Sequence, residues 1–183
     1  MKILMITVLL FVAAAAGFPL PAQQENASNP EYEIVKQVIT DSLGWAKTKD
    51  YNRLESIWAD DETIFSHFLF SRNTIIGKKA FMNNAEKFRS PDFKATRTEY
   101  RDFRIIFSKS GDVAWFSCNF DDCGEYKGQE FCVENALKTG VLEKRTGKWV
   151  LVQVHSSYPA DKIPESLIRH FYGHLFESEK KQP

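Results

Sequence analysis

The sequence predicts an α+β domain, with helices in its first half and an antiparallel sheet in its second half. Two observations predict this class. Apolar residues recur at every third or fourth position over much of residues 31–88, as they do in amphipathic helices. From Lys94 onward they recur at every second position, and turn signals separate the runs, as in strands joined by hairpins. Helices followed by a meandering sheet form the α+β arrangement.

Composition indicates one globular domain with an aromatic core. The chain has 183 residues, of which 43% are hydrophobic and 26% charged, and 15 are Phe. A chain of this length can bury a sizeable core. The 24 basic residues balance the 24 acidic ones, so nothing in the charge favours nucleic acid or an anionic membrane as a partner.

The N-terminus has the pattern of an export signal. Lys2 precedes an apolar run from Ile3 to Ala16, which is too short to span a bilayer comfortably, and small residues follow it. Cleavage after Gly17 or Ala22 fits this pattern. We therefore expect a signal peptide over residues 1–22, a polar linker over 23–30, and a mature protein exported to the periplasm or secreted, free of the membrane. An uncleaved membrane anchor is the alternative.

The first half contains three predicted helices and one strand. Residues 31–49 form the first helix, and residues 50–58 form a short second helix that Asp50 caps. A strand over 63–70 follows. The third helix spans residues 78–88, directly after Gly77.

The second half contains three predicted hairpins in a row. Turns at residues 108–111, 125–129 and 145–148 separate strands that end at Phe107, span 113–123 and 131–144, and finish with 149–157. Hairpins join antiparallel strands, so we expect the sheet to be antiparallel. The domain would cover residues 31–159. An amphipathic helix over 161–178 is expected in the C-terminal segment 160–183.

Several short motifs, in this order, resemble the SnoaL-like branch of the nuclear transport factor 2-like superfamily. They are KDYNRLESIWADDETIF at 49–65, IGKKAF at 76–81, GDVAWF at 111–116 and VLEKRTGKWVLVQVHSS at 141–157. The resemblance implies a curved sheet that N-terminal helices wrap into a cone, a pocket inside the cone, and frequent homodimerisation through the sheet.

The chain departs from the functional residues of this superfamily. Ser66 stands where ketosteroid isomerases have an aspartate base, and Ser42 stands where they have an oxyanion-binding tyrosine. Proton transfer next to a carbonyl needs both a base and a donor. Ser117 and Gly140 lie near the places of two pocket arginines of the kinase-association domain. Neither the isomerase activity nor the carboxylate binding of the kinase-association domain is therefore carried over to this chain.

Strand alternation and turn type together predict a polar stripe across the sheet. Two-residue loops at 127–128 and 146–147 would place Ser117, Lys138 and His155 in one row, whereas three-residue loops would replace Lys138 by Leu137. Hydrophobic matching favours the first register, and Asp102 would extend the row. The candidate ligand-binding residues are Trp115, Ser117, Asn119, Lys138, Gln153 and His155. The alternatives are a solvated sheet face or a dimer face.

Three residues are candidates for acid–base catalysis: His67, Asp102 and His155. Histidine titrates near neutral pH, although His67 could equally be a buried structural residue. His170, His174 and Glu177 share one flank of the last predicted helix, but a solvated flank is the favoured interpretation. We expect no metal and no cofactor, because neither a phosphate-binding nor a dinucleotide motif is present.

The three cysteines do not have the spacing of a zinc site. In the two-residue-loop register Cys123 lies opposite Cys132, which permits a disulfide in an exported protein. The three-residue-loop register would put these two cysteines on opposite faces. Cys118 has no assigned partner.

The sequence leaves three functions open. The first is an exported protein that binds a small molecule in a pocket. The second is an acid–base enzyme, such as a hydrolase, isomerase or dehydratase, acting on a small organic substrate. The third is a homodimeric association module.

Overall fold

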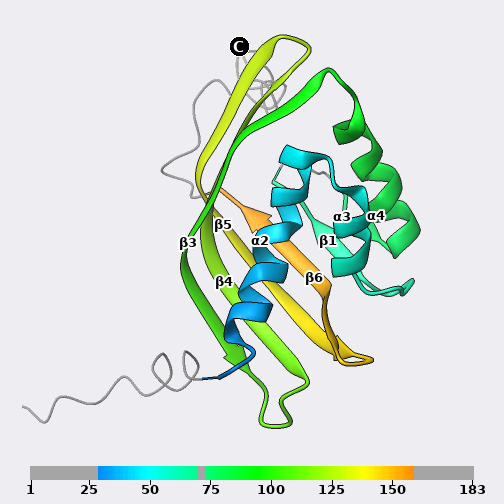
Figure 1. Cartoon of the computed structure of the whole chain (residues 1–183), viewed down its shortest axis with the longest axis vertical. Helices are drawn as coiled ribbons and strands as arrows, with labels where there is room; N and C mark the ends of the chain where they lie inside the picture. The colour runs from blue at the N-terminus through cyan, green and yellow to red at the C-terminus, as the bar shows by residue number, and fades with distance from the viewer. Residues whose placement is uncertain (1–28, 70–72, 159–183) are drawn as a thin grey trace, which may run out of the picture.

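A computed structural model describes residues 29–69 and 73–158, and it shows an α+β fold in which helices cover one face of a curved, unclosed six-stranded sheet (Figure 1). The helices are α2 (Tyr32–Thr48), α3 (Tyr51–Ile57) and α4 (Lys78–Ala85), with a 3₁₀ turn η1 (Glu86–Arg89). The strands are β1 (Phe65–His67), β2 (Ile75–Ile76), β3 (Phe93–Phe107), β4 (Val113–Tyr126), β5 (Gln129–Arg145) and β6 (Lys148–Ser157). The expected fold class is confirmed. The expected export signal and C-terminal helix lie outside the described residues.

Local interactions define where helices α2 and α3 end and begin. α2 buries Val35, Ile39 and Trp45 on one face, and the chain leaves it through Lys49 in the left-handed conformation. Asp50 caps α3, because its carboxylate accepts a hydrogen bond from the backbone N–H of Arg53 at 2.9 Å. No helix in the described ranges is long and apolar enough to cross a bilayer.

The sheet is mixed, and the expectation of a wholly antiparallel sheet is wrong. Its strand order is β2-β1-β6-β5-β4-β3, and β1 pairs with β6 in parallel. The hairpin argument applies to strands that follow one another in the chain. β1 and β6 are separated by most of the domain, so no turn sets their relative direction. β2, which the sequence did not reveal, pairs antiparallel with β1 at the edge.

The β4–β5 and β5–β6 hairpins use two-residue loops, as hydrophobic matching favoured. Tyr126 pairs with Gln129, and Arg145 pairs with Lys148. The loop residues have positive φ in both turns, at 52° and 78° for Lys127 and Gly128. Paired positive φ values are typical of type I′ turns, whose twist matches that of the strands they join.

Two bulges shift the registers that the turns alone would set. On β5 the bulged residue is Asn135, whose φ is 56°. Asp121, opposite it on β4, accepts hydrogen bonds at 2.8 Å from the Asn135 backbone N–H and from Arg101. On β6 the pairing passes from Leu151 directly to Gln153 and leaves Val152 unpaired. Each bulge moves the following residues by one position, which exchanges the two faces of the strand beyond it.

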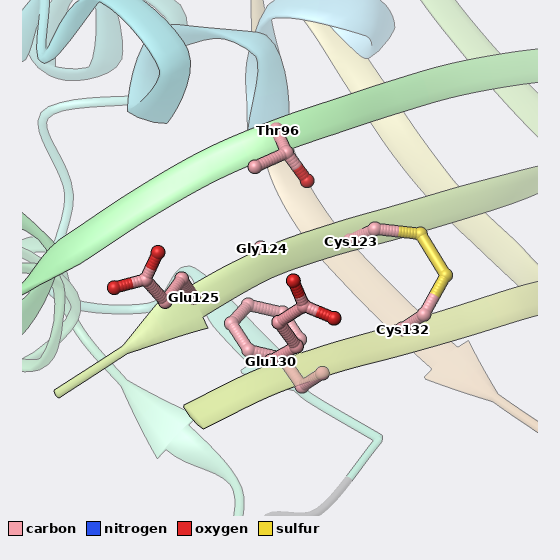
Figure 2. Close-up of a pocket in the computed structure, with 7 residues that line it drawn as sticks. Thr96, Cys123, Gly124, Glu125, Glu130 and Cys132 are labelled. Carbon is pink, nitrogen blue, oxygen red and sulfur yellow. A yellow bond between two sulfur atoms is a disulfide. The ribbon is translucent and has the colours of Figure 1, made fainter. Parts of the chain in front are cut away.

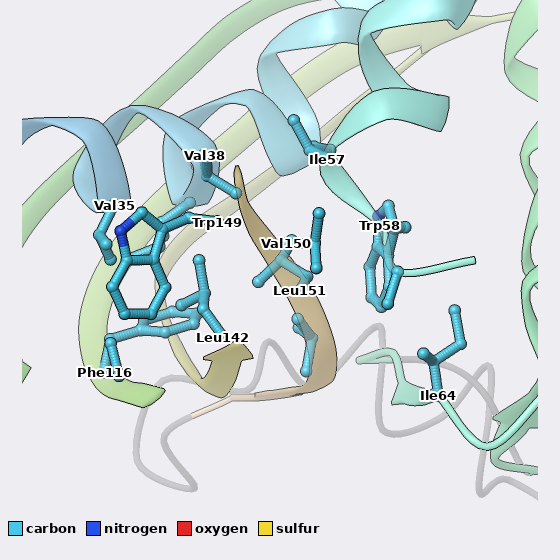
Figure 3. Close-up of a cluster of buried hydrophobic side chains, with 14 of the residues drawn as sticks. Val35, Val38, Ile57, Trp58, Ile64, Phe116, Leu142, Trp149, Val150 and Leu151 are labelled. Atoms are coloured by element: carbon cyan, nitrogen blue, oxygen red, sulfur yellow. The ribbon is translucent and has the colours of Figure 1, made fainter. Parts of the chain in front are cut away.

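The core lies between the helices and the sheet (Figure 3). Ile39, Leu54, Leu142 and Leu151 are each 0% exposed, and Phe116 and Trp149 pack in the same cluster. Gly140 has no side chain because the ring of Phe116 takes that space. A Cβ at Gly140 would lie 2.6 Å from the Phe116 ring and 2.5 Å from the carbonyl oxygen of Gln153.

Candidate functional site

The expected polar stripe divides between the two faces of the sheet. Ser117 pairs with Thr139, and Thr139 pairs with His155, so these three form a row on the face away from the helices. Lys138 instead pairs with Cys118 and Ser156 on the helix-covered face. The expected row of Ser117, Lys138 and His155 is therefore wrong. The bulge at Asn135 separates Lys138 from Ser117, and the bulge at Val152 separates it from His155.

The outer face holds most of the other candidate residues. Trp115, on the neighbouring row, is 45% exposed and shares that row with Val141 and Gln153. Asn119 pairs with Leu137 on the same face. Strict alternation along β6 would put Trp149 and Leu151 on the face of His155, but the bulge at Val152 turns them toward the helices.

The acid–base candidates also lie on the outer surface. His67 pairs with His155 across the parallel strands, and their ring centroids are 5.6 Å apart. Asp102 does not extend the row, because a bulge with φ 54° removes it from the register between Arg101 and Arg104. No group of three or more His, Cys, Asp or Glu side chains in the described part of the chain is placed to hold a metal.

Lys138 is the centre of a buried polar cluster on the concave, helix-covered face. Its Nζ donates hydrogen bonds to two hydroxyls, Tyr100 Oη at 2.8 Å and Ser42 Oγ at 3.0 Å. The two hydroxyls also bond one another at 3.0 Å. Nζ lies 4.8 Å from the centroid of the Phe120 ring. Lys138 is only 2% exposed, which is rare for a lysine.

Burial shifts the pKa values of Lys138, Tyr100 and Cys118 in this cluster. Loss of hydration lowers the pKa of Lys138 from 10.5 to about 8, although Cys118 and Asp122 act in the opposite direction. Burial also raises the pKa of Tyr100 well above its usual value and that of Cys118 to about 11. At neutral pH the cluster therefore contains a buried ammonium beside a phenol and a thiol that both keep their protons.

Two further polar groups are buried on this side of the sheet without a partner. Among the described residues, Ser66 Oγ and Trp58 Nε1 make no hydrogen bond, and Ser66 is 1% exposed. Ser66 pairs with Val154, whose other neighbour is Gly140 on β5. Two strand spacings of about 5 Å and two residues of about 3.3 Å along β5 separate Ser66 from Lys138, so they lie roughly 12 Å apart across the sheet. An unpaired buried hydroxyl costs free energy unless something binds to it.

The concave face can thus offer several donors to one bound molecule. A lysine ammonium has three N–H bonds, and the described contacts use two of those on Lys138. The third N–H, the Ser66 hydroxyl and the Trp58 indole N–H can each bind an oxygen acceptor. Aromatic and aliphatic side chains surround them. Sequence reasoning noticed Ser42 and Ser66 only as replacements for other residues, and it missed Tyr100, because no local pattern joins positions so far apart.

The cysteines have two different environments. Cys123 and Cys132 lie opposite one another in the register of β4 and β5 and are joined by a disulfide. Cys118 is a free thiol buried beside Lys138. Its raised pKa makes it a poor nucleophile at neutral pH.

Comparison with known proteins places this geometry in a family. The SnoaL-like domain family matches residues 35–161, which is most of the chain. No curated protein is significantly similar to the chain in sequence.

Solved structures share the fold at low identity. A protein from Novosphingobium aromaticivorans described as a scytalone dehydratase aligns with a TM-score of 0.60 and 13% identity, over 69% of this chain and 82% of that one. A hexachlorocyclohexane dehydrochlorinase, LinA type 2, aligns with a TM-score of 0.57 and 21% identity, over 68% of this chain and 82% of that one. A protein from Xanthomonas campestris described as a calcium/calmodulin-dependent protein kinase II association domain aligns with a TM-score of 0.59 and 20% identity, over 74% of this chain and 91% of that one. At these identities the likeness concerns the fold.

Proposed function

This chain is a member of the SnoaL-like domain family, and on that premise we propose that it binds a small organic molecule against the concave face of its sheet. The observation that carries the proposal is the buried ammonium of Lys138. It is held by two neutral hydroxyls, from Ser42 and Tyr100, and no carboxylate within the described ranges forms a hydrogen bond or ion pair with it. Asp122 attracts the ammonium electrostatically but forms no ion pair with it. A buried charge without a directly bonded counterion is costly, and a ligand oxygen would offset that cost.

The surroundings of Lys138 indicate the chemistry of the ligand. Phe120, Tyr100 and Ala136 provide apolar contacts near the ammonium. Ser66 and Trp58 add neutral donors farther along the face. A largely apolar molecule that carries a carbonyl or carboxylate group at one end matches this distribution. Trp115, Ser117, Asn119, Gln153 and His155 lie on the other face and are not part of this site.

A ligand screen with matched variants tests the proposal. Aromatic carboxylates, ketones and alcohols would be compared by thermal shift at pH 7 on wild-type protein, Lys138→Met and His155→Ala. We expect ligands that stabilise wild type and His155→Ala equally but bind Lys138→Met at least several-fold more weakly. A hydrogen bond to a charged donor is worth about 1.5–3 kcal/mol. Ligands that bind Lys138→Met as tightly as wild type would contradict the proposed site.

An acid–base enzyme is the second candidate, and the lowered pKa of Lys138 favours it. With a pKa of about 8, roughly a tenth of the amine is neutral at pH 7 and able to accept a proton. The phenol of Tyr100 stays protonated and can donate to the same substrate oxygen. The pair would supply the base and donor that Ser66 and Ser42 cannot. Turnover should then rise with pH through about 8 and be lost in Lys138→Met.

Homodimerisation through the outer face is proposed on the basis of its exposed apolar side chains. Phe65, Trp115 and Leu137 are 45%, 45% and 40% exposed on the outer surface of the sheet, and Ile76 at its edge is 63% exposed. Exposed apolar side chains that share one face favour an interaction surface there. The ring pair of His67 and His155 lies within the same face.

Export is proposed on the basis of the N-terminal pattern and the disulfide. A bond between Cys123 and Cys132 persists in oxidising compartments. The intact mass of protein purified from the organism that makes it would decide the question. We expect a mature chain that begins after Gly17 or Ala22, and a chain that still begins at Met1 would contradict export with cleavage.

A further inference from the structure

The far end of the β4–β5 hairpin extends beyond the helices (Figure 1) and has a feature that the concave site does not use. The disulfide between Cys123 and Cys132 crosses the two strands there. Its two ends differ in accessibility, since Cys123 is 8% exposed whereas Cys132 is exposed. Cys132 is therefore the more accessible end of the bond for a small reagent in solution.

A guanidinium group contacts both sulfurs. Nη2 of Arg97 lies 3.4 Å from Sγ of Cys123 and 3.6 Å from Sγ of Cys132. Glu134 and Asp121 hold the same Nη2 at 2.5 Å and 3.9 Å. A disulfide sulfur carries no charge, so this position brings little benefit while the bond is intact. Once the bond opens, the same guanidinium faces a thiolate, and cations stabilise thiolates.

An open groove gives access to the disulfide (Figure 2). Both cysteines line it, together with Thr96, Gly124, Glu125 and Glu130. Gly124 keeps its strand close to the ring of Phe131, because a Cβ there would lie 2.7 Å from that ring. The bond thus lies at the wall of an open groove, with its Cys132 end on the exposed side.

We propose that the Cys123–Cys132 bond is a thiol–disulfide exchange site for small thiols. The thiolate of a small thiol attacks Sγ of Cys132, a new sulfur–sulfur bond forms, and the Cys123–Cys132 bond breaks. The electron pair of the broken bond leaves on Cys123 as a thiolate beside Arg97. A second thiolate attacks the thiol-derived sulfur of the mixed disulfide, which releases a symmetric disulfide and the Cys132 thiolate. The protein gains two electrons, and the two thiols lose them. A lower leaving-group pKa speeds this exchange, so Arg97 is a positioning residue for it.

Exchange with 2-mercaptoethanol under native conditions tests the proposal. The full mature protein would be mixed with the thiol, quenched with N-ethylmaleimide at timed intervals, and mapped by peptide mass spectrometry. We expect the mixed disulfide on Cys132, with N-ethylmaleimide on Cys123. Arg97→Gln should slow the exchange about fivefold because the leaving thiolate loses its cation, and Arg97→Lys should restore most of the rate.

Arg104→Gln is the matched control. Arg104 is an exposed arginine on the same strand, opposite Ser117 and away from the sulfurs, and we expect the wild-type rate from this variant. The proposal is overturned if the bond opens only at the rate of global unfolding measured in the same buffer. It is also overturned if Arg97→Gln and Arg104→Gln change the rate equally, or if the mixed disulfide forms on Cys123.

Discussion

Replacing Lys138 by methionine should stabilise the protein at neutral pH. Burial lowers the pKa of Lys138 from 10.5 to about 8, and each pKa unit is worth about 1.4 kcal/mol. Keeping the ammonium charged in the folded state below pH 8 therefore costs about 3 kcal/mol relative to the unfolded chain. Methionine has a similar length and no charge. The hydroxyls of Ser42 and Tyr100 already bond one another at 3.0 Å, so the substitution leaves neither without a partner.

The effect should depend on pH in a defined direction. Because the folded pKa is the lower one, the unfolded chain binds a proton between pH 8 and 10.5 that the folded protein does not. The free energy of unfolding of wild type therefore rises with pH through this window, while Lys138→Met lacks this contribution. From pH 7 to pH 9.5 the stability advantage of Lys138→Met should shrink by about 2 kcal/mol.

Urea denaturation at pH 7, 8, 9 and 9.5 measures this difference. Lys148→Met is the control, because Lys148 is exposed at the β5–β6 turn and its replacement should give a difference that does not change with pH. A Lys138→Met advantage that stays constant across the range would refute the reasoning, because it would mean that Lys138 titrates alike in the folded and unfolded states.

Three other substitutions test the architecture around the site. Asp121→Asn should cost about 1–3 kcal/mol of stability, since the carboxylate accepts hydrogen bonds from Arg101 and from the bulge at Asn135. Arg101 lowers the pKa of Asp121. Urea denaturation should therefore show this contribution to stability at pH 7 and its loss as the pH falls below about 4. Gly140→Ala should destabilise by about 1–3 kcal/mol because its methyl group would overlap the Phe116 ring, and an unchanged melting temperature would contradict that packing. Trp115→Glu should convert a dimer to a monomer in sedimentation at micromolar concentration, and a wild type that is itself monomeric would contradict the proposed interface.

Much of the fold could be predicted because its signals are local. The stripe of Val35, Ile39 and Trp45 sets one face of a helix, Asp50 caps the next, and glycines at the second loop positions favour the two tight turns. β1 and β2 are very short, and their pairing depends on strands far away in the chain, so the mixed sheet could not be predicted in the same way.

The site was predicted less well because β-bulges change which residues share a face of the sheet. Alternation along a strand assigns faces correctly only as far as the next bulge. Asn135 and Val152 have no distinctive local pattern, yet each exchanges the faces of the residues beyond it. Lys138 thereby leaves the expected row of Ser117 and His155 and lies in the interior. The bulge at Asn135 depends on Asp121 and Arg101, which come from two other strands, so the information is tertiary.

We propose that Lys138 binds a ligand on the concave face. The most direct measurement is a crystal structure of the protein purified from the organism that makes it, with electron density inspected around Lys138 Nζ. We predict density for a small organic molecule with an oxygen atom within hydrogen-bond distance of Nζ, and with contacts to Phe120 or Ser66. An interior occupied by protein side chains alone, in which Nζ contacts only Ser42 and Tyr100, would contradict it.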